Sequence, residues 1–170
     1  AGRMGRGHGY ALIAIVLRAE SRGTVELASA DPKAAPLIDP HFLEVENDLE
    51  TLVKGVKIAR AMLESKPFEP YRGEELKPGR EYRTDDELRQ FVRDNFVTVF
   101  HPVGTCRMGP GEGAVVNHEL KVHGIGGLRV VDASIMPTLI AGNTNAPCIM
   151  IAEKAADMMF GRPAPAPADL

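Results

Sequence analysis

The chain has 170 residues, about the size of one domain, and its 44% hydrophobic and 25% charged residues are typical of a folded globular protein. Its net charge of −3 argues against a nucleic-acid-binding protein, which would carry a basic surplus. Two cysteines, Cys106 and Cys148, are too few for a disulfide scaffold and favour a reducing, cytoplasmic compartment. The longest apolar run near the start is too short to cross a bilayer, so no transmembrane segment is expected.

The N-terminal part of the chain predicts a β-hairpin. Residues 10–21 (YALIAIVLRAES) are rich in branched apolar side chains and predict a buried strand. Residues 22–24 predict a turn, and residues 25–29 (VELAS) predict a second strand that pairs with the first. Residues 31–43 contain three prolines and predict a loop.

The middle of the chain predicts two amphipathic helices. In residues 46–65 the apolar side chains recur at helical spacing, and Asn47 with Glu50 resembles a capping box. A second helix is expected to begin after Thr84, with Glu87 completing a capping box. The expected apolar stripe of the first helix consists of Leu49, Leu52, Val53, Val56, Ala59 and Leu63.

The C-terminal half mixes short strands with one further helix. Residues 96–100 and 128–131 predict strands, and residues 145–160 predict a largely buried helix that ends at Gly161. Without regular βαβ alternation, the pattern predicts an α+β fold. We expect one domain over residues 1–161, followed by a Pro/Ala-rich tail over residues 162–170.

Several familiar site signatures can be excluded. The stretch GPGEGA at 109–114 fits a dinucleotide fingerprint, but it contains Pro110 and opens no predicted helix, so it is interpreted as a connector. No G-x-S-x-G motif supports serine-hydrolase chemistry. No metal site is predicted, because zinc spacing is absent from the candidate ligands His101, Cys106, His118, His123 and Cys148.

Two loops remain as candidate sites. Residues 100–109 (FHPVGTCRMG) and 130–147 (VVDASIMPTLIAGNTNAP) interrupt apolar elements with glycine, proline and polar residues, as catalytic loops on a rigid scaffold do. Pro102 fixes the backbone after His101, and Gly104 permits close approach of a ligand. Composition alone favours a structural loop with a hydrogen-bonded histidine slightly over a catalytic one.

These two loops, together with IMIAEKAADMM at 149–159, resemble the C-terminal part of the glucose–methanol–choline (GMC) flavin oxidoreductases, in their choline and alcohol dehydrogenase branch. Residues 17–43 resemble the start of that family's C-terminal domain, so the likeness covers nearly the whole chain. It implies an antiparallel sheet with flanking helices that covers the flavin and binds substrate. The family's N-terminal Rossmann-like unit, which holds most of the FAD, is lacking here, and the chain has no initiator methionine, so we expect a piece of a longer protein.

The resemblance also implies roles for individual residues. His101 matches the catalytic histidine, and an imidazole, which titrates near neutral pH, suits a base or an alkoxide stabiliser. Asn143 matches the second active-site position, while Thr144 departs from the proline that is frequent in the family's NPN motif. FAD contacts are implied for four further residues, Asp132 and Ala133 near the ribityl–phosphate region and Asn145 and Ala146 near the pyrimidine end.

The leading hypothesis is therefore the C-terminal part of an FAD-dependent enzyme that oxidises a primary alcohol, choline-like or aliphatic or aromatic, to the aldehyde. Its expected partners are the small-molecule alcohol and an N-terminal FAD-binding domain. Alone, the chain is expected to be inactive, and its uncovered apolar surface allows self-association. Two alternatives stay open: a non-catalytic stand-alone or partner-binding module, and an alcohol oxidase that uses oxygen. Membrane association of the full-length protein also stays open.

Overall fold

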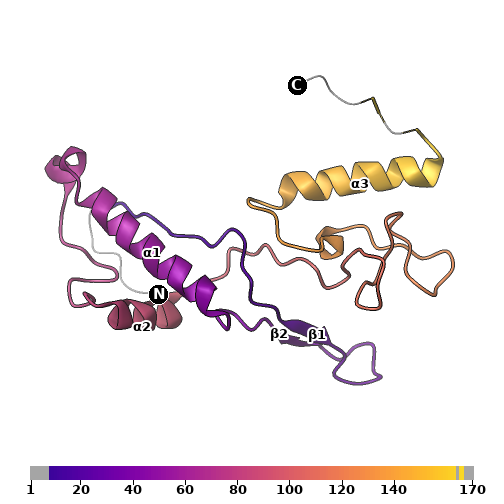
Figure 1. The fold of residues 1–170 in the computed structure, drawn as a ribbon, viewed down its shortest axis with the longest axis horizontal. Coiled ribbons are helices and arrows are strands. Elements are labelled where there is room, and N and C mark those ends of the chain that lie inside the picture. Colours follow the sequence, from indigo (N-terminus) through magenta and orange to yellow (C-terminus); the bar gives the residue numbers. More distant parts are fainter. Residues whose placement is uncertain (1–7, 164, 167–170) are drawn as a thin grey trace. The chain divides into compact units, whose positions relative to one another are not determined.

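The computed structural model describes residues 8–163, 165 and 166, and the chain divides into two compact units (Figure 1). The first unit comprises Ala1–Val16 and Phe42–Phe96, and the second comprises Leu17–His41 and Val97–Leu170. Residues 164 and 167–170 of the predicted tail lie outside the described residues. The limits of the predicted domain stay a prediction.

Two helices, α1 (Glu46–Leu63) and α2 (Asp85–Asn95), pack against each other in the first unit. Both were predicted from apolar periodicity, and both predictions are confirmed. A 3-10 helix, η1 (Lys66–Tyr71), follows α1. The side chains that the helices bury against each other are Leu49, Val53, Leu88 and Val92, all at most 4% exposed.

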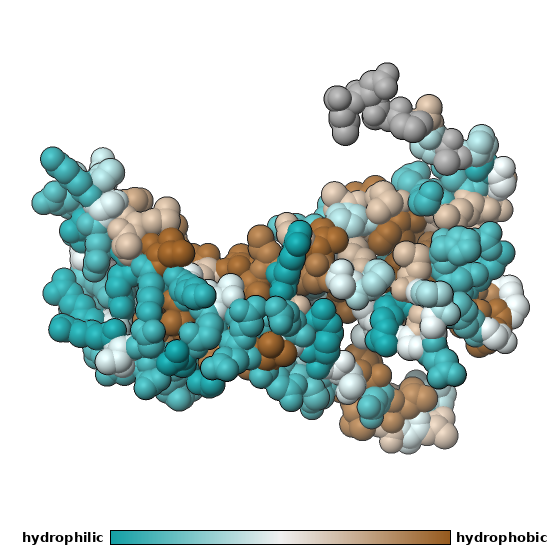
Figure 2. Space-filling view, in the orientation of Figure 1, coloured by the Kyte–Doolittle hydropathy of each residue, from teal (hydrophilic) through white to brown (hydrophobic). Residues whose placement is uncertain are grey.

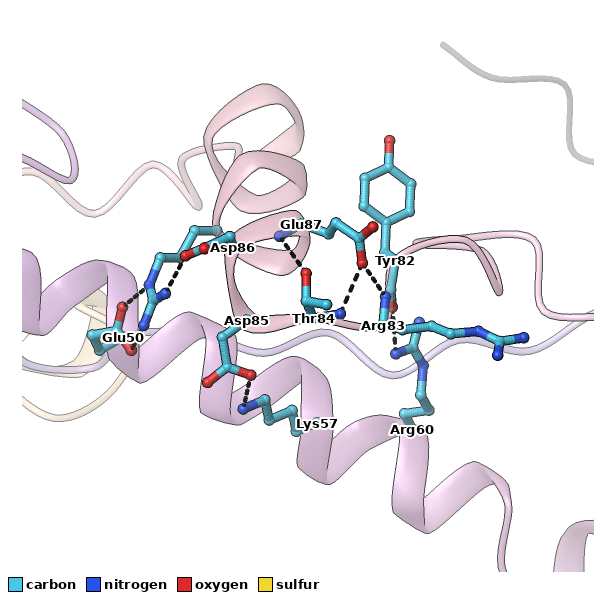
Figure 3. A network of polar contacts seen from close by, with 10 residues as sticks. Glu50, Lys57, Arg60, Tyr82, Arg83, Thr84, Asp85, Asp86 and Glu87 are labelled. Carbon is cyan, nitrogen blue, oxygen red and sulfur yellow. Dashed lines mark hydrogen bonds and ion pairs between the residues drawn. The ribbon is translucent and has the colours of Figure 1, made fainter.

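The two predicted helix starts have different outcomes. The capping box at α2 is confirmed, because Thr84 Oγ1 accepts from the Glu87 N–H and a Glu87 carboxylate oxygen accepts from the Thr84 N–H at 2.8 Å (Figure 3). The capping box predicted at α1 is wrong. That helix begins after Val45 without a side-chain cap, and Glu50 instead binds Arg89 of α2 through both carboxylate oxygens.

Ion pairs join α1 to α2 and to the segment between them. Besides Glu50 with Arg89, Lys57 of α1 pairs with Asp85 at the start of α2 (Figure 3). The Arg89 hydrogen bond lowers the pKa of Glu50, and the Lys57 hydrogen bond lowers the pKa of Asp85. The pKa of Glu87 is lowered by hydrogen bonds from the backbone N–H groups of Thr84 and Arg83. All three carboxylates are therefore favoured in their charged form by the fold.

The second unit contains a hairpin that the sequence interpretation misplaced. The strand predicted over residues 10–21 is wrong, because the structure has no strand there. β1 (Thr24–Glu26) instead pairs antiparallel with β2 (Leu37–Asp39), inside the segment predicted as a loop. Pro36 and Pro40 flank β2 without interrupting it, and the chain between the strands turns at Asp31, whose carboxylate accepts from the Lys33 N–H.

The remaining part of the second unit is held by irregular pairing and one helix. The predicted strands at 96–100 and 128–131 do not form, although an isolated bridge joins Lys121 to Arg129. α3 (Asn145–Phe160) has the predicted bounds and ends at Gly161, whose φ of 65° suits the left-handed cap. It is less buried than predicted, since Ile149 is 56% exposed. The core of this unit consists of Val116, Leu120, Ile135, Met136, Ile151 and Ala155.

The α+β prediction is confirmed, with a sheet of two antiparallel strands in the described residues. Apolar side chains gather on the outside of this hairpin, where Figure 2 shows them in brown, and Leu37 and Ile38 are 57% and 65% exposed.

The connector interpretation of residues 109–114 is also confirmed, because no helix follows them. Residues 109–114 therefore lack the strand–turn–helix geometry that a dinucleotide fingerprint needs.

The lowered pKa values predict that the first unit loses stability in acid. The carboxylates of Glu50, Asp85 and Glu87 ionise more easily in the folded than in the unfolded chain. Their contribution to stability is therefore complete above their unfolded pKa values, which lie near 4.5 for Glu50 and Glu87. This contribution to stability is lost as the pH falls from the unfolded pKa values through the lower pKa values of the folded state. We expect the free energy of unfolding, measured by urea denaturation with circular dichroism, to fall between about pH 5 and pH 2.

The matched variant is Glu87→Gln, which keeps an acceptor suited to the capping box but cannot titrate. Its free energy of unfolding should fall less steeply with acid than that of the wild type. Parallel curves for the two proteins would show that the Glu87 carboxylate does not contribute to acid stability.

Candidate active site

The two candidate loops are joined by their backbones. The N–H of Cys106 donates to the carbonyl of Ser134 at 3.0 Å, and the N–H of Met108 donates to that of Ile135 at 2.8 Å. The second loop contains a short 3-10 helix, η2 (Ala133–Ile135), which Asp132 caps by accepting from the Ser134 N–H at 2.7 Å. Segments nearly 30 positions apart in the sequence therefore lie side by side.

Both loops are mounted on the hydrophobic core of the second unit. Ile135 and Met136 of one loop are buried at 4% and 7% exposure, and Val103 and Met108 of the other pack against the same cluster. Met108 and Met136 thus belong to the packing of this unit. The polar residues of these loops are consequently held by a packed scaffold.

His101 contacts the loop that leads into α3. Its imidazole is half-buried, and Nδ1 lies 2.9 Å from Oγ1 of Thr144, a hydrogen bond between residues 43 positions apart. The preceding residue, Phe100, has a φ of 62°, an uncommon conformation for a bulky side chain that costs about 1–2 kcal/mol. This left-handed residue would end an extended strand at position 100, and residues 96–99 form no strand pairing with another segment among the described residues.

Asn143 directly precedes the residue that binds His101. Its side chain is exposed, and the described residues supply no hydrogen-bond partner for its amide. The structure thereby brings the two predicted catalytic positions into the same region of the fold, through Thr144. Thr144 was named in the sequence interpretation only as a departure from proline, and that departure is the one sequence signal that pointed to it.

The predicted cofactor-binding residues fall into two groups. Asn145 and Ala146 form the exposed first residues of α3, and no acceptor among the described residues binds their backbone N–H groups. Pro147 has no N–H, and Thr144 gives the helix no side-chain cap. Asp132 is exposed and Ala133 half-buried at the start of η2. The open helix start would favour a negatively charged group.

A pocket and the other candidate groups contain none of the predicted site residues. The pocket has a volume of about 410 Å³ and is lined by residues 121–127 with Asn117 and Arg129. His123, in this pocket, contacts the Gly109 carbonyl at 3.0 Å. Across residues 8–163, 165 and 166, no three His, Cys, Asp or Glu side chains are grouped to hold a metal ion. Within the same ranges, no helix has the length and apolar character needed to cross a membrane.

Comparison with known proteins identifies the family to which the sequence is similar. The C-terminal family model described as GMC oxidoreductase matches residues 19–152. An alcohol dehydrogenase [acceptor] of Pseudomonas putida is 46% identical over 153 residues, which is 90% of this chain and 28% of that protein. An oxygen-dependent choline dehydrogenase of Chromohalobacter salexigens is 44% identical over 155 residues, or 91% of this chain and 28% of that protein.

Solved structures agree with these relatives. Pyridoxine 4-oxidase from Mesorbium loti superposes with a TM-score of 0.80 at 32% identity, covering 87% of this chain and 29% of that one. A fungal aryl-alcohol oxidase gives a TM-score of 0.78 at 34% identity, covering 85% of this chain and 24% of that one. The chain thus spans little more than a quarter of the length of the curated relatives it matches.

Gly104 offers a test of how tightly the His101 loop is built. Its φ is 91°, and an added Cβ would lie 3.3 Å from the carbonyl oxygen of Met136. We expect Gly104→Ala to lower the free energy of unfolding by about 1–2 kcal/mol, because both the backbone and the contact resist a side chain. Urea denaturation followed by circular dichroism measures this.

The matched control is Gly111→Ala, since nothing lies within 4 Å of an added Cβ at Gly111. That variant should retain wild-type stability or gain slightly. Equal stabilities for the Gly104 and Gly111 variants would contradict the constraint at Gly104.

Proposed function

Because the chain belongs to the GMC oxidoreductase family, as the C-terminal region of choline- and alcohol-dehydrogenase-like flavoproteins, we propose that it forms the substrate side of an FAD-dependent alcohol dehydrogenase. The FAD-binding portion then lies in the part of the relatives that this chain does not cover. The observation that carries the proposal is the His101–Thr144 hydrogen bond, which joins the two candidate loops beside Asn143.

The proposed reaction converts R–CH₂–OH to R–CHO by removing a proton from the oxygen and a hydride from the carbon. His101 accepts the hydroxyl proton, or stabilises the alkoxide as it forms, by general base catalysis. Asn143, whose exposed amide has no partner among the described residues, donates a hydrogen bond to the same oxygen. The half-buried setting of His101 keeps part of the imidazole accessible to a substrate.

FAD fits the groups that the second unit presents. The N–H groups of Asn145 and Ala146 at the open start of α3 suit the pyrimidine end of the flavin, which becomes negatively charged on reduction. Asp132 and Ala133 at η2 would lie against the ribityl–phosphate region. When bound, FAD supplies the acceptor for the hydride. These contacts are few, which agrees with a cofactor held mainly by another part of the protein.

The substrate that we propose is a primary alcohol, with choline as the first compound to test. Relatives named for choline and for alcohols are among those most similar in sequence, and both named relatives are dehydrogenases. The oxidase alternative is supported by the names of the solved structures. The two differ in how the reduced flavin of the purified enzyme is reoxidised. An oxidase reduces one O₂ to H₂O₂ for each alcohol oxidised without any other acceptor, whereas a dehydrogenase needs a separate electron acceptor.

The role of His101 predicts a large kinetic effect in the flavoprotein that carries this chain. Under anaerobic conditions with excess choline, His101→Ala should slow flavin reduction by about 10²- to 10⁴-fold while FAD remains bound. Stopped-flow absorbance of the flavin measures this independently of the electron acceptor. His118→Ala, at an exposed histidine outside the candidate loops, serves as the matched control and should leave the rate unchanged. A normal rate in the His101 variant would refute the assignment.

The proposed enzyme and the non-catalytic alternative both predict an isolated chain without flavin, and they differ in what the gene encodes upstream. If FAD is held mainly elsewhere, the purified 170-residue chain should be colourless and lack the visible flavin absorbance. A yellow preparation that retains FAD through gel filtration would contradict that division. The coding sequence upstream of Ala1 separates the two functions, because only the enzyme requires an in-frame G-x-G-x-x-G unit there.

A further inference from the structure

Thr144 occupies a helix-capping position without capping the helix. Threonine at this position commonly accepts a hydrogen bond from a backbone N–H one turn into the helix. At the start of α3 no such bond forms, and the Thr144 hydroxyl lies 2.9 Å from Nδ1 of His101 instead. The side chain best suited to stabilise the helix therefore contacts the candidate catalytic residue.

We propose that Thr144 is a positioning residue that keeps the proton of the neutral His101 imidazole on Nδ1. Nδ1–H then donates to Oγ1 of Thr144, and Nε2 carries the lone pair that receives the proton of the alcohol. The hydrogen-bonded pair supplies the orientation and the protonation pattern, and His101 performs the chemistry. This role rests on the proposed function of His101 as a base.

The direction of the hydrogen bond follows from the two protonation states of a catalytic base, the neutral and the protonated imidazole. A neutral imidazole carries one proton, and after accepting the proton of the alcohol it carries one on each nitrogen. A bond donated by Nδ1–H serves both states, and it strengthens when the ring becomes positively charged. A bond donated by the hydroxyl to Nδ1 would have to reverse each time the ring is protonated. The first arrangement therefore needs no rearrangement during the reaction.

Both partners are held by the same core, which makes the bond suitable for positioning. The Thr144 carbonyl accepts from the Cys148 N–H at 3.0 Å at the start of α3, and that helix buries Ile151 and Ala155. On the other side, Val103 packs against this core two residues after His101. Among the described residues, no further hydrogen-bond partner competes for the Thr144 hydroxyl.

The tautomer can be measured without turnover. In the chain labelled with [¹⁵N]histidine, long-range ¹H–¹⁵N correlation spectra at about pH 8, where imidazoles are largely neutral, identify which ring nitrogen carries the proton. We expect Nδ1 in the wild type and in Thr144→Ser, which keeps the hydroxyl. Thr144→Val keeps the branched shape but lacks the hydroxyl, so its His101 should lose this preference. A proton on Nε2 in the wild type overturns the proposal.

The kinetic consequence is measured in the flavoprotein. Thr144→Val should lower the rate constant of flavin reduction at saturating choline about 10- to 100-fold, because the base is less well oriented, while Thr144→Ser stays within about threefold of the wild type. The dissociation constant for choline should remain within about twofold in both variants. The valine variant should bind FAD normally, because the threonine side chain contributes no cap to α3.

The outcomes separate this proposal from the proposed function. If His101→Ala abolishes flavin reduction but Thr144→Val does not slow it, His101 is the base and the positioning role is refuted. Equal losses in the valine and serine variants also refute it, since they would reflect packing instead of the hydroxyl. If His101→Ala has no effect, the catalytic assignment fails for both residues. The nitrogen spectra then still decide whether Thr144 fixes the tautomer.

Discussion

A small hydrophobic core in the second unit supports every group to which a role is assigned. Ile135 and Met136 anchor one loop and Ile151 and Ala155 anchor α3, while Val103 ties the His101 loop to the same cluster. Burying these side chains is favourable by roughly 25 cal/mol for each Å² of apolar surface removed from water. Because protein interiors are closely packed, the polar residues beside them inherit defined positions. The chemistry is thus arranged by packing that has no chemical function of its own.

The positions of the helices could be predicted from the sequence, whereas strand pairing could not. The Thr84 cap of α2 and the Gly161 cap of α3 are local signals that hydrogen bonds within one turn satisfy. The apolar stripe of α1 is visible as periodicity within one segment, although it is buried by packing against α2. Residues 10–21 are apolar and branched, but a strand needs a partner at a distance, and none forms. The three-residue strands β1 and β2 are too short and too exposed to show alternation.

The candidate site shows the same difference between local signals and long-range contacts. The roles of His101 and Asn143 stay predictions that rest on the resemblance of their loops to the GMC family, since composition alone favoured a structural histidine. The contact between His101 and Thr144 spans 43 positions and exists only once both loops are mounted on one core. Strain at Phe100 was equally invisible, because a left-handed backbone at a bulky residue leaves no pattern in the sequence. A motif is therefore easier to find in the sequence than the contacts that its residues make in the fold.

The prolines beside β2 have a consequence for colloidal behaviour. The hairpin presents Val25, Leu37 and Ile38 to solvent, a combination of edge and apolar surface that invites intermolecular strand addition. Pro36 and Pro40 limit β2 to three residues, and neither has an N–H to offer an incoming strand. The edge is too short and too poor in donors to template a growing sheet. The two residues that favoured a loop over a strand in the sequence thereby disfavour the addition of a further strand at this edge.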